Sequence, residues 1–170
     1  MQAVDASETK TLFSFDNPGE GQWLSVNDTV MGGRSDSGLV IRNGILHFSG
    51  NLSLENNGGF TSIRHDLPID LSARTGIRLR VKGDGRSYQL RLQTDSRYFG
   101  RPVAFSGTFK TVEGEWTEVE VAFDELQASF RGRQLDEYSF DPAKIEVIGI
   151  LLGDYNPGPF HLEIDRMIAF

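Results

Sequence analysis

Cysteine is absent from this 170-residue chain, which excludes disulfides, zinc–thiolate sites and thiol catalysis. The missing thiols say nothing about the compartment, because a chain without cysteine is indifferent to redox conditions. No apolar run approaches the roughly 20 residues that a membrane-spanning helix needs, so we expect no membrane span. A single domain of this length buries about 68–70% of the surface that its unfolded chain exposes, and it therefore needs no covalent staple.

Positive charge is in the minority. The chain has 17 Lys and Arg against 24 Asp and Glu, with a net charge of −7 and a pI of about 4.9. An acidic protein is repelled by phosphate backbones, so nucleic acid is not an expected partner. The first ten residues, MQAVDASETK, lack the features of a signal peptide or a mitochondrial transit peptide. We expect residues 1–10 to be a polar tail and the location to be cytoplasmic; an exported or organellar location would require that a targeting segment had been removed.

Signals of catalysis are also scarce. His47, His65 and His161 are dispersed, and we expect neither an H-x-x-x-H nor an H-x-E metal pattern among them, so we expect surface imidazoles. No G-x-S-x-G elbow marks a serine nucleophile, and GDGRSY at residues 83–88 lacks the third glycine of a dinucleotide loop. Asp and Glu are numerous, but nothing marks two of them as the acid–base pair of a glycosidase. We therefore expect a protein that is not an enzyme.

The chain does have a regular alternation of apolar and polar residues. Residues 77–93, IRLRVKGDGRSYQLRLQ, alternate on both sides of Asp84-Gly85, a dipeptide suited to a type I′ turn. The pattern predicts a hairpin of residues 77–82 and 87–93. Its predicted core face consists of Ile77, Leu79, Val81, Tyr88, Leu90 and Leu92.

Other segments alternate in the same way. They are residues 44–50, 59–67, 116–123 and 159–170, with a further strand expected near TLFSFD at residues 11–16. Residues 145–152, IEVIGILL, are apolar nearly throughout, as expected of a central strand covered on both faces. Only residues 122–132 and 141–147 suggest short helical turns. About eight to ten short strands separated by turns predict an all-β fold, a single-domain jelly-roll β-sandwich over residues 11–170.

Two arginines would lie opposite each other in the predicted hairpin. Arg78 would face Arg91, and like charges directly opposed on a sheet are unfavourable unless an anion covers them. A neighbouring strand carrying Glu118, Glu120 or Glu163 would compensate them in an ion ladder. The alternative is an anionic or hydroxyl-rich ligand, or an acidic segment of a partner. We expect the ion ladder, in which case Arg91→Gln changes the free energy of unfolding by no more than about 1 kcal/mol.

Several motifs resemble one protein family. WLSVNDTVMGGRSDS at residues 23–37 is followed by NGGFTSIR at 57–64 and LRVKGDGRSYQLRL at 79–92. Trp116, the FRG of residues 130–132 and GPFHLEID at 158–165 extend the pattern. Together they resemble the complex I intermediate-associated protein family, from about Phe13 to the C-terminus, with only the polar tail outside.

The resemblance implies a galactose-binding-like jelly roll, the architecture of many carbohydrate-binding modules. Mitochondrial members of the family are chaperone-like assembly factors of respiratory complex I, whereas the bacterial members that this short chain resembles mostly have no assigned role. We therefore expect a non-enzymatic binding module that acts on a protein partner as an assembly factor or chaperone-like adaptor. The alternatives are a carbohydrate-binding module with a glycan ligand and, less favoured, an enzyme of unknown type.

The first motif is a candidate loop for binding a partner or ligand, consisting of Asn27, Asp28, Val30, Met31, Gly32, Gly33 and Ser35. Asn27 and Asp28 can bond to nearby backbone groups and set a turn, while the glycines permit positive φ. Val30 and Met31 either plug one end of the sandwich or form an adaptable contact surface.

The second motif contributes Gly58, Gly59, Phe60, Ser62 and Arg64. The two glycines suit a turn into a strand that carries the other three residues on one face. If Phe60 is buried, Arg64 also points inward unless a bulge breaks the pattern. A buried arginine needs a carboxylate, and we expect Asp28 to supply it.

A glycan site on such a sandwich needs exposed aromatic platforms beside polar groups. Tyr98 is the best platform, because Arg97 and Arg101 flank it in SRYFGRP. The residues of this expected ligand face are Arg78, Arg91, Tyr98, Arg101, Trp116 and Arg131.

No cofactor is expected except a structural calcium ion. Jelly rolls that resemble carbohydrate-binding modules often carry one where the first and last strands meet. Asp16, Asn17 and Asp165 could supply the oxygen ligands that calcium prefers. Alternatively, Asp16 and Asn17 form a turn before Pro18 and Asp165 pairs with a base.

Overall fold

The chain folds almost entirely into β-strands. The structure is a computed structural model that describes residues 9–16, 22–27 and 33–170. Its strands are β1 (Lys10–Phe13), β2 (Leu24–Asn27), β3 (Asp36–Arg42), β4 (Ile45–Leu52), β5 (Thr61–Ile69), β6 (Gly76–Lys82), β7 (Ser87–Tyr98), β8 (Arg101–Lys110), β9 (Trp116–Ala122), β10 (Gln127–Phe130), β11 (Arg133–Gln134), β12 (Ile145–Leu152) and β13 (Gly158–Ala169). Among the described residues, three short 3-10 turns interrupt them: η3 (Glu55–Asn57), η4 (Phe123–Glu125) and η5 (Pro142–Lys144).

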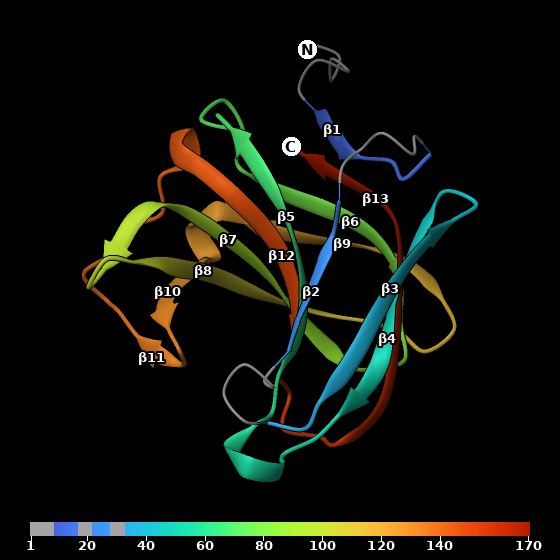
Figure 1. Ribbon diagram of the computed structural model, residues 1–170. Coiled ribbons are helices and arrows are strands. Elements are labelled where there is room, and N and C mark those ends of the chain that lie inside the picture. The colour runs from blue at the N-terminus through green and yellow to red at the C-terminus, as the bar shows by residue number, and fades with distance from the viewer. Residues whose placement is uncertain (1–8, 17–21, 28–32) are drawn as a thin grey trace.

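Two antiparallel sheets face each other (Figure 1). Sheet A has the order β3-β4-β13-β6-β9, and β1 pairs with β13; sheet B has the order β11-β10-β8-β7-β12-β5-β2. The predicted all-β jelly-roll sandwich is therefore confirmed. Strand β12 is central in sheet B, as its apolar sequence indicated.

The core between the sheets contains the side chains that the alternation placed there. Ile77, Leu79 and Val81 reach it from sheet A and Tyr88, Leu90 and Leu92 reach it from sheet B, all with no exposed surface. Alternation predicts burial well because successive side chains of a strand point to opposite faces.

The predicted hairpin, however, is wrong. Strand β6 belongs to sheet A and β7 to sheet B, so Asp84-Gly85 lies in a crossover between the sheets. The type I′ geometry occurs elsewhere, at Asn43-Gly44 between β3 and β4, where φ is 53° and 74°. Both arrangements turn the same residues toward the core, so alternation cannot distinguish a hairpin from a crossover of this kind.

The crossover separates the two arginines expected to face each other. Arg78 lies on the outer face of sheet A, opposite Glu120 on β9. Its guanidinium forms an ion pair with the Glu120 carboxylate, at a nitrogen–oxygen distance of 2.6 Å. Arg80 on the same face pairs with Asp165. Arg91 lies on sheet B, away from these acids. The prediction that Arg78 faces Arg91 is therefore wrong.

We expect Arg78→Gln to change the free energy of unfolding by no more than about 1 kcal/mol, because exposed ion pairs are screened by water. The side chains of Arg78 and Glu120 are 31% and 50% exposed. Urea unfolding of the variant beside the parent chain measures the change, and a loss well above this value would contradict the surface assignment.

The expected helical turns are also short. Residues 122–132 form only η4 before β10 begins. In η5 the Asp141 carboxylate accepts a hydrogen bond of 3.0 Å from the Ala143 backbone N–H, which caps the turn. Within the described residues, no helix has the length and hydropathy to cross a bilayer.

Candidate functional site

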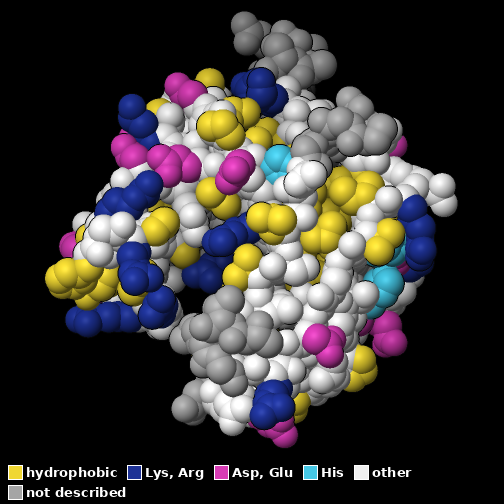
Figure 2. Space-filling view, viewed as in Figure 1, with side chains coloured by type: hydrophobic (Ala, Val, Ile, Leu, Met, Phe, Trp, Pro, Cys, Tyr) yellow, Lys and Arg dark blue, Asp and Glu magenta, His cyan; other side chains and the backbone are white. Residues whose placement is uncertain are grey.

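The outer face of sheet B is hollowed into a trough of about 760 Å³. It lies over β5, β12, β7, β8 and β10 and is closed at one end by Gly58, Gly59, Phe60, Gly153 and Tyr155. In the space-filling view, basic side chains gather around this hollow (Figure 2). We refer to this surface as the trough.

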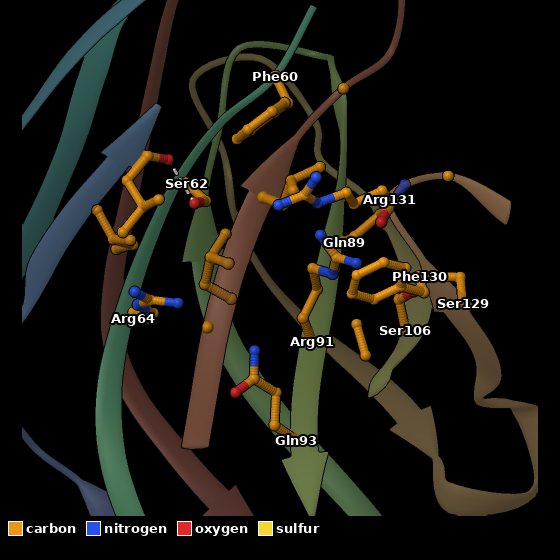
Figure 3. A pocket seen from close by; sticks show the side chains of 18 of the residues that line it. Phe60, Ser62, Arg64, Gln89, Arg91, Gln93, Ser106, Ser129, Phe130 and Arg131 are labelled. Atoms are coloured by element: carbon orange, nitrogen blue, oxygen red, sulfur yellow. Dashed lines mark hydrogen bonds between the residues drawn. The ribbon is translucent and has the colours of Figure 1, made fainter. Parts of the chain in front are cut away.

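A cross-strand row of residues forms the middle of the trough. In register across β5, β12, β7 and β8 stand Arg64, Gly149, Arg91 and Ser106. Gly149 has no side chain between the two arginines, and an added Cβ would lie only 2.8 Å from the Ile63 carbonyl oxygen. Because Gly149 has no side chain, the floor of the trough is open at this point, between the side chains of Arg64 and Arg91 (Figure 3).

Arg91 is the most unusual charge in the trough. Its Nε atom is buried and has no hydrogen-bond partner among the described residues. Burial lowers the pKa of its guanidinium, because removal from water disfavours the charged form. The expected compensation of Arg91 by acidic neighbours is wrong, because β7 is in the other sheet from Glu118, Glu120 and Glu163.

No described residue lining the trough is Asp or Glu, whereas three are arginines. The third, Arg131, lies at the rim with its guanidinium 5.5 Å from the centroid of the Phe130 ring. Its φ of 48° belongs to the two-residue turn that it forms with Gly132 between β10 and β11. The result is a positively charged hollow in a chain whose net charge is −7.

Neutral polar groups and aromatic rings complete the lining. Gln89 and Gln93 stand on either side of Arg91 along β7, with their amides in the trough (Figure 3). Phe60 and Tyr155 lie at the closed end, where the Tyr155 side chain is 81% exposed. The trough thus offers cationic donors, amide groups and a few apolar surfaces along one continuous groove.

The second sequence motif contributes to this site, and Phe60 is not buried, so the condition for an inward Arg64 is not met. Phe60, Ser62 and Arg64 do share one side, as predicted, but that side faces the trough and Arg64 is exposed. The core instead receives Thr61 and Ile63. Gly58 and Gly59 form part of the closed end. The predicted partner of Arg64, Asp28, lies outside the described residues.

The described part of the first motif makes structural contacts. The Asn27 side-chain carbonyl accepts hydrogen bonds from the hydroxyls of Ser37 (2.7 Å) and Thr61 (2.6 Å), which joins β2, β3 and β5. Ser35 is buried and its hydroxyl bonds to both backbone groups of Ser53. Gly33 is buried. Asp28, Val30, Met31 and Gly32 lie outside the described residues, so both interpretations of the Val-Met pair stay predictions.

The expected ligand face is not one surface. Arg91 and Arg131 line the trough, whereas Arg78 and Trp116 belong to sheet A, where the Arg80 guanidinium lies 4.7 Å from the Trp116 ring centroid. Tyr98 packs against the rings of Phe99, Phe130 and Tyr138 and is only half exposed. Arg101 is exposed at the start of β8. The correction follows from the crossover, which sends β6 and β7 to different sheets.

Two of the residues expected to bind calcium, Asp16 and Asp165, have other contacts, whereas Asn17 lies outside the described residues. Asp165 accepts a hydrogen bond from Arg80, while its second oxygen is buried without a hydrogen-bond partner among the described residues. Asp16 lies against Gly44 in the turn between β3 and β4. The calcium ion stays a prediction, and Asp165 would have to exchange Arg80 for it.

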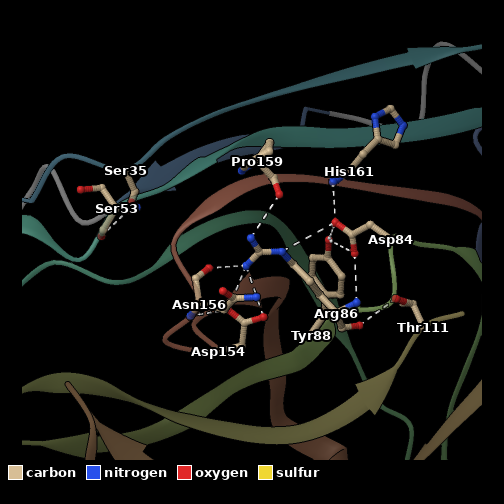
Figure 4. A network of polar contacts seen from close by, with 10 residues as sticks. All are labelled: Ser35, Ser53, Asp84, Arg86, Tyr88, Thr111, Asp154, Asn156, Pro159 and His161. Carbon is tan, nitrogen blue, oxygen red and sulfur yellow. Dashed lines mark hydrogen bonds and ion pairs between the residues drawn. The ribbon is translucent and has the colours of Figure 1, made fainter. Parts of the chain in front are cut away.

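A polar network that sequence reasoning did not anticipate holds the crossover in place (Figure 4). The Asp84 carboxylate accepts hydrogen bonds from the Tyr88 hydroxyl at 3.1 Å and the His161 backbone N–H at 2.8 Å. Arg86 donates to Asp154 at 3.0 Å and to the Pro159 carbonyl at 3.1 Å. Burial and the nearby Asp84 carboxylate raise the pKa of Tyr88, which keeps the phenol protonated as a donor. GDGRSY is thus a structural clamp.

The sandwich resembles solved carbohydrate-binding modules in its fold. It matches the Family 11 Carbohydrate-Binding Module of the cellulosomal cellulase Lic26A-Cel5E of Clostridium thermocellum with a TM-score of 0.73 and 16% identity, covering 99% of this chain and 96% of that module. The same module in complex with a β-1,3-1,4-mixed-linked tetrasaccharide gives a TM-score of 0.70 and 15% identity, with 95% of each chain covered. At these identities the likeness concerns the fold.

The sequence itself identifies the family. The model of Complex I intermediate-associated protein 30 (CIA30) matches residues 13–164, and the chain belongs to this family. A mouse (Mus musculus) relative, "Complex I intermediate-associated protein 30, mitochondrial", is 28% identical over 194 residues. The match covers 100% of this chain but only 58% of that protein. The resemblance inferred from the motifs is therefore confirmed.

Proposed function

We propose that this chain is a non-enzymatic binding module that holds an acidic segment of a protein partner in the trough, in the manner of an assembly factor. The observation that carries the proposal is the lining of the trough, which has three arginines and no carboxylate among its described residues. In a protein of net charge −7, most of the surface repels an acidic segment, and this groove attracts it.

The chemistry of arginine favours a carboxylate ligand. A guanidinium group has only donors, and its planar fork matches the two oxygens of a carboxylate. The unpaired Nε of Arg91 lies in the floor of the trough, where a bound carboxylate would exclude water and strengthen the contact. The amides of Gln89 and Gln93 would bond to the backbone of an extended segment lying along β7.

Membership of the CIA30 family supports a protein as the ligand. The name of the mouse relative associates it with an intermediate of complex I. By analogy, the partner of this chain would be an incompletely assembled subunit, and the trough would hold one of its acidic segments until assembly proceeds.

A glycan is the second candidate, and two observations favour it. One fold neighbour is described in complex with a tetrasaccharide. The amides and hydroxyls of the trough, such as Gln89, Gln93 and Ser129, suit the hydroxyl groups of a sugar chain. The arginines distinguish the two candidates, because a neutral glycan offers no charge to compensate them.

We expect a fluorescent Asp/Glu-rich peptide to bind the chain and a neutral peptide of equal length not to bind. Arg131→Gln should weaken binding about tenfold or more, the usual effect of losing a charge-assisted hydrogen bond. Fluorescence anisotropy measures both affinities, and binding should weaken as the salt concentration rises. The matched control is Arg166→Gln on the other sheet, where Arg166 and Glu118 form an exposed pair at 3.7 Å.

The same assay should include a neutral mixed-linkage β-glucan oligosaccharide and a uronic acid oligosaccharide. Binding of a sugar alone, weakened by Arg131→Gln but not by Arg166→Gln, would replace the protein ligand by the glycan. Peptide binding that both variants weaken equally would mean a general charge effect and would contradict the trough as the site. Failure of every ligand would overturn the proposal.

A further inference from the structure

Two histidines and a glutamate meet on the outer face of sheet A, on the side of the molecule opposite to the trough. His47 on β4 stands in register with Glu163 on β13, and His161 lies two residues earlier on β13. His47 Nδ1 is 3.4 Å from His161 Nε2 and 3.8 Å from a Glu163 carboxylate oxygen. His161 Nε2 is 4.0 Å from the other Glu163 oxygen. One ligand atom from each of the three residues can be chosen so that all three atoms lie within 4.8 Å of one another.

We propose that His47, His161 and Glu163 bind a divalent transition-metal ion of the zinc class, which bridges β4 and β13. In tetrahedral coordination with Zn–N bonds of about 2.0–2.1 Å, two ligand nitrogens lie about 3.3–3.4 Å apart. The two imidazole nitrogens already stand at this separation before any ion is present. The Glu163 oxygens stand 3.8 and 4.0 Å from these nitrogens, so the carboxylate would have to move closer to both of them to bind the ion.

The surroundings hold the ligands in place. The His161 backbone N–H donates to Asp84 at 2.8 Å, which ties this end of β13 to the crossover. The His47 and Glu163 side chains are only 15% and 18% exposed, because they lie between neighbouring strands.

The ligand types select the ion. Imidazole nitrogens suit zinc, copper and nickel, whereas magnesium and calcium prefer oxygen ligands. This site is therefore distinct in chemistry from the calcium ion considered at Asp16 and Asp165. Three protein ligands leave the fourth tetrahedral position open, and His161 faces solvent with 51% of its side chain exposed. A water molecule or a side chain of a partner would complete the coordination.

One neighbour opposes the ion. Lys82 on β6 has its ammonium 4.0 Å from a Glu163 oxygen, so without metal it shares the charge of this carboxylate. A bound cation would compete with the ammonium for Glu163. The proposal therefore predicts changes of opposite sign: removal of a ligand weakens metal binding, and removal of the Lys82 charge strengthens it.

The experiment is isothermal titration calorimetry of the full, chelator-treated chain with zinc chloride, with cobalt(II) absorption as a second readout. We expect one zinc ion per chain and the intense visible bands of tetrahedral cobalt. His161→Asn and Glu163→Gln should each weaken zinc binding by more than the roughly 10–100-fold that loss of an outer partner of a ligand causes. Lys82→Gln should strengthen it, and Glu120→Gln, an exposed acid on the same face, should leave it unchanged. Calcium and magnesium should give no heat that His161→Asn or Glu163→Gln removes.

Circular dichroism of each metal-free variant shows whether it is folded, and only folded variants enter the comparison. Because His161 and Glu163 are tested separately, one unfolded variant leaves the other as the test. Absence of zinc binding by the parent chain would overturn the proposal. So would binding that persists at full affinity in His161→Asn or Glu163→Gln, since the ion would then be held elsewhere.

Discussion

Arg86→Met should lower the free energy of unfolding by about 3–5 kcal/mol, the usual result of removing one partner of a buried ion pair. The Arg86 side chain is 11% exposed and that of its partner Asp154 is 20% exposed. Methionine keeps much of the apolar volume of arginine, so the loss would come from the missing charge and hydrogen bonds. The Asp154 carboxylate and the Pro159 carbonyl would lose their donor together.

The position of Arg86 in the fold makes the effect large. The residue lies where the chain crosses from sheet A to sheet B, and its guanidinium reaches the loop between β12 and β13. It also donates to the Asn156 carbonyl at 2.6 Å. One side chain therefore fixes two connections between the sheets. Arg86→Lys should restore little, because an ammonium cannot reach the carboxylate and both carbonyls in the planar arrangement of a guanidinium.

Urea unfolding followed by tryptophan fluorescence measures the effect. The matched control is Arg166→Met, because Arg166 and Glu118 form a pair in which both side chains are at least half exposed. That control should change stability by less than about 1 kcal/mol. An Arg86→Met variant as stable as the control would contradict the role assigned to the clamp.

The sequence predicted which side chains of each strand are buried better than it predicted which strands pair with each other. Leu79 and Leu90 are buried as expected, because period-two alternation depends only on the local geometry of a strand. Which strands pair depends on contacts between distant segments, so alternation in residues 77–93 did not show that the chain changes sheets. The error moved Arg91 from an expected ion ladder to the floor of the trough.

The candidate sites show the same division. The NGGFTSIR motif did identify trough residues, but the orientation of Arg64 depended on which face of β5 is covered. His47 and His161 are 114 residues apart, and only the pairing of β4 with β13 brings them together. One local signal existed: His161-Leu162-Glu163 is an H-x-E triplet, which places both ligands on one side of a strand. The expectation of dispersed surface imidazoles overlooked it.

Arg91→Met should have the opposite effect to Arg86→Met and raise the free energy of unfolding, by about 1–2 kcal/mol. The Arg91 Nε atom is buried without a hydrogen-bond partner, and no described residue lining the trough carries a compensating carboxylate. An unsatisfied buried polar group costs about 1–3 kcal/mol, and an apolar side chain of similar length removes that cost. This reverses the small change expected for a compensated arginine.

The same substitution should also weaken the binding that we propose. Arg91 supplies a half-buried cation in the floor of the trough, so Arg91→Met should weaken binding of the Asp/Glu-rich peptide by about tenfold or more. A gain in stability together with weaker binding would mean that Arg91 serves ligand binding and not the stability of the fold. The matched control is Arg64→Met, on the other side of Gly149 in the same row. Arg64 is exposed, so its replacement should change stability by less than about 0.5 kcal/mol.

Thermal and urea unfolding of both variants, measured with and without the peptide, separate the two effects. The parent chain should gain stability from the peptide, because a ligand that binds only the folded state raises its free energy of unfolding. Arg91→Met should be more stable than the parent without peptide and should gain less stability than the parent when the peptide is added. A destabilised Arg91→Met chain would mean that Arg91 supports the fold. A stabilised chain that still binds the peptide with full affinity would remove Arg91 from the binding site.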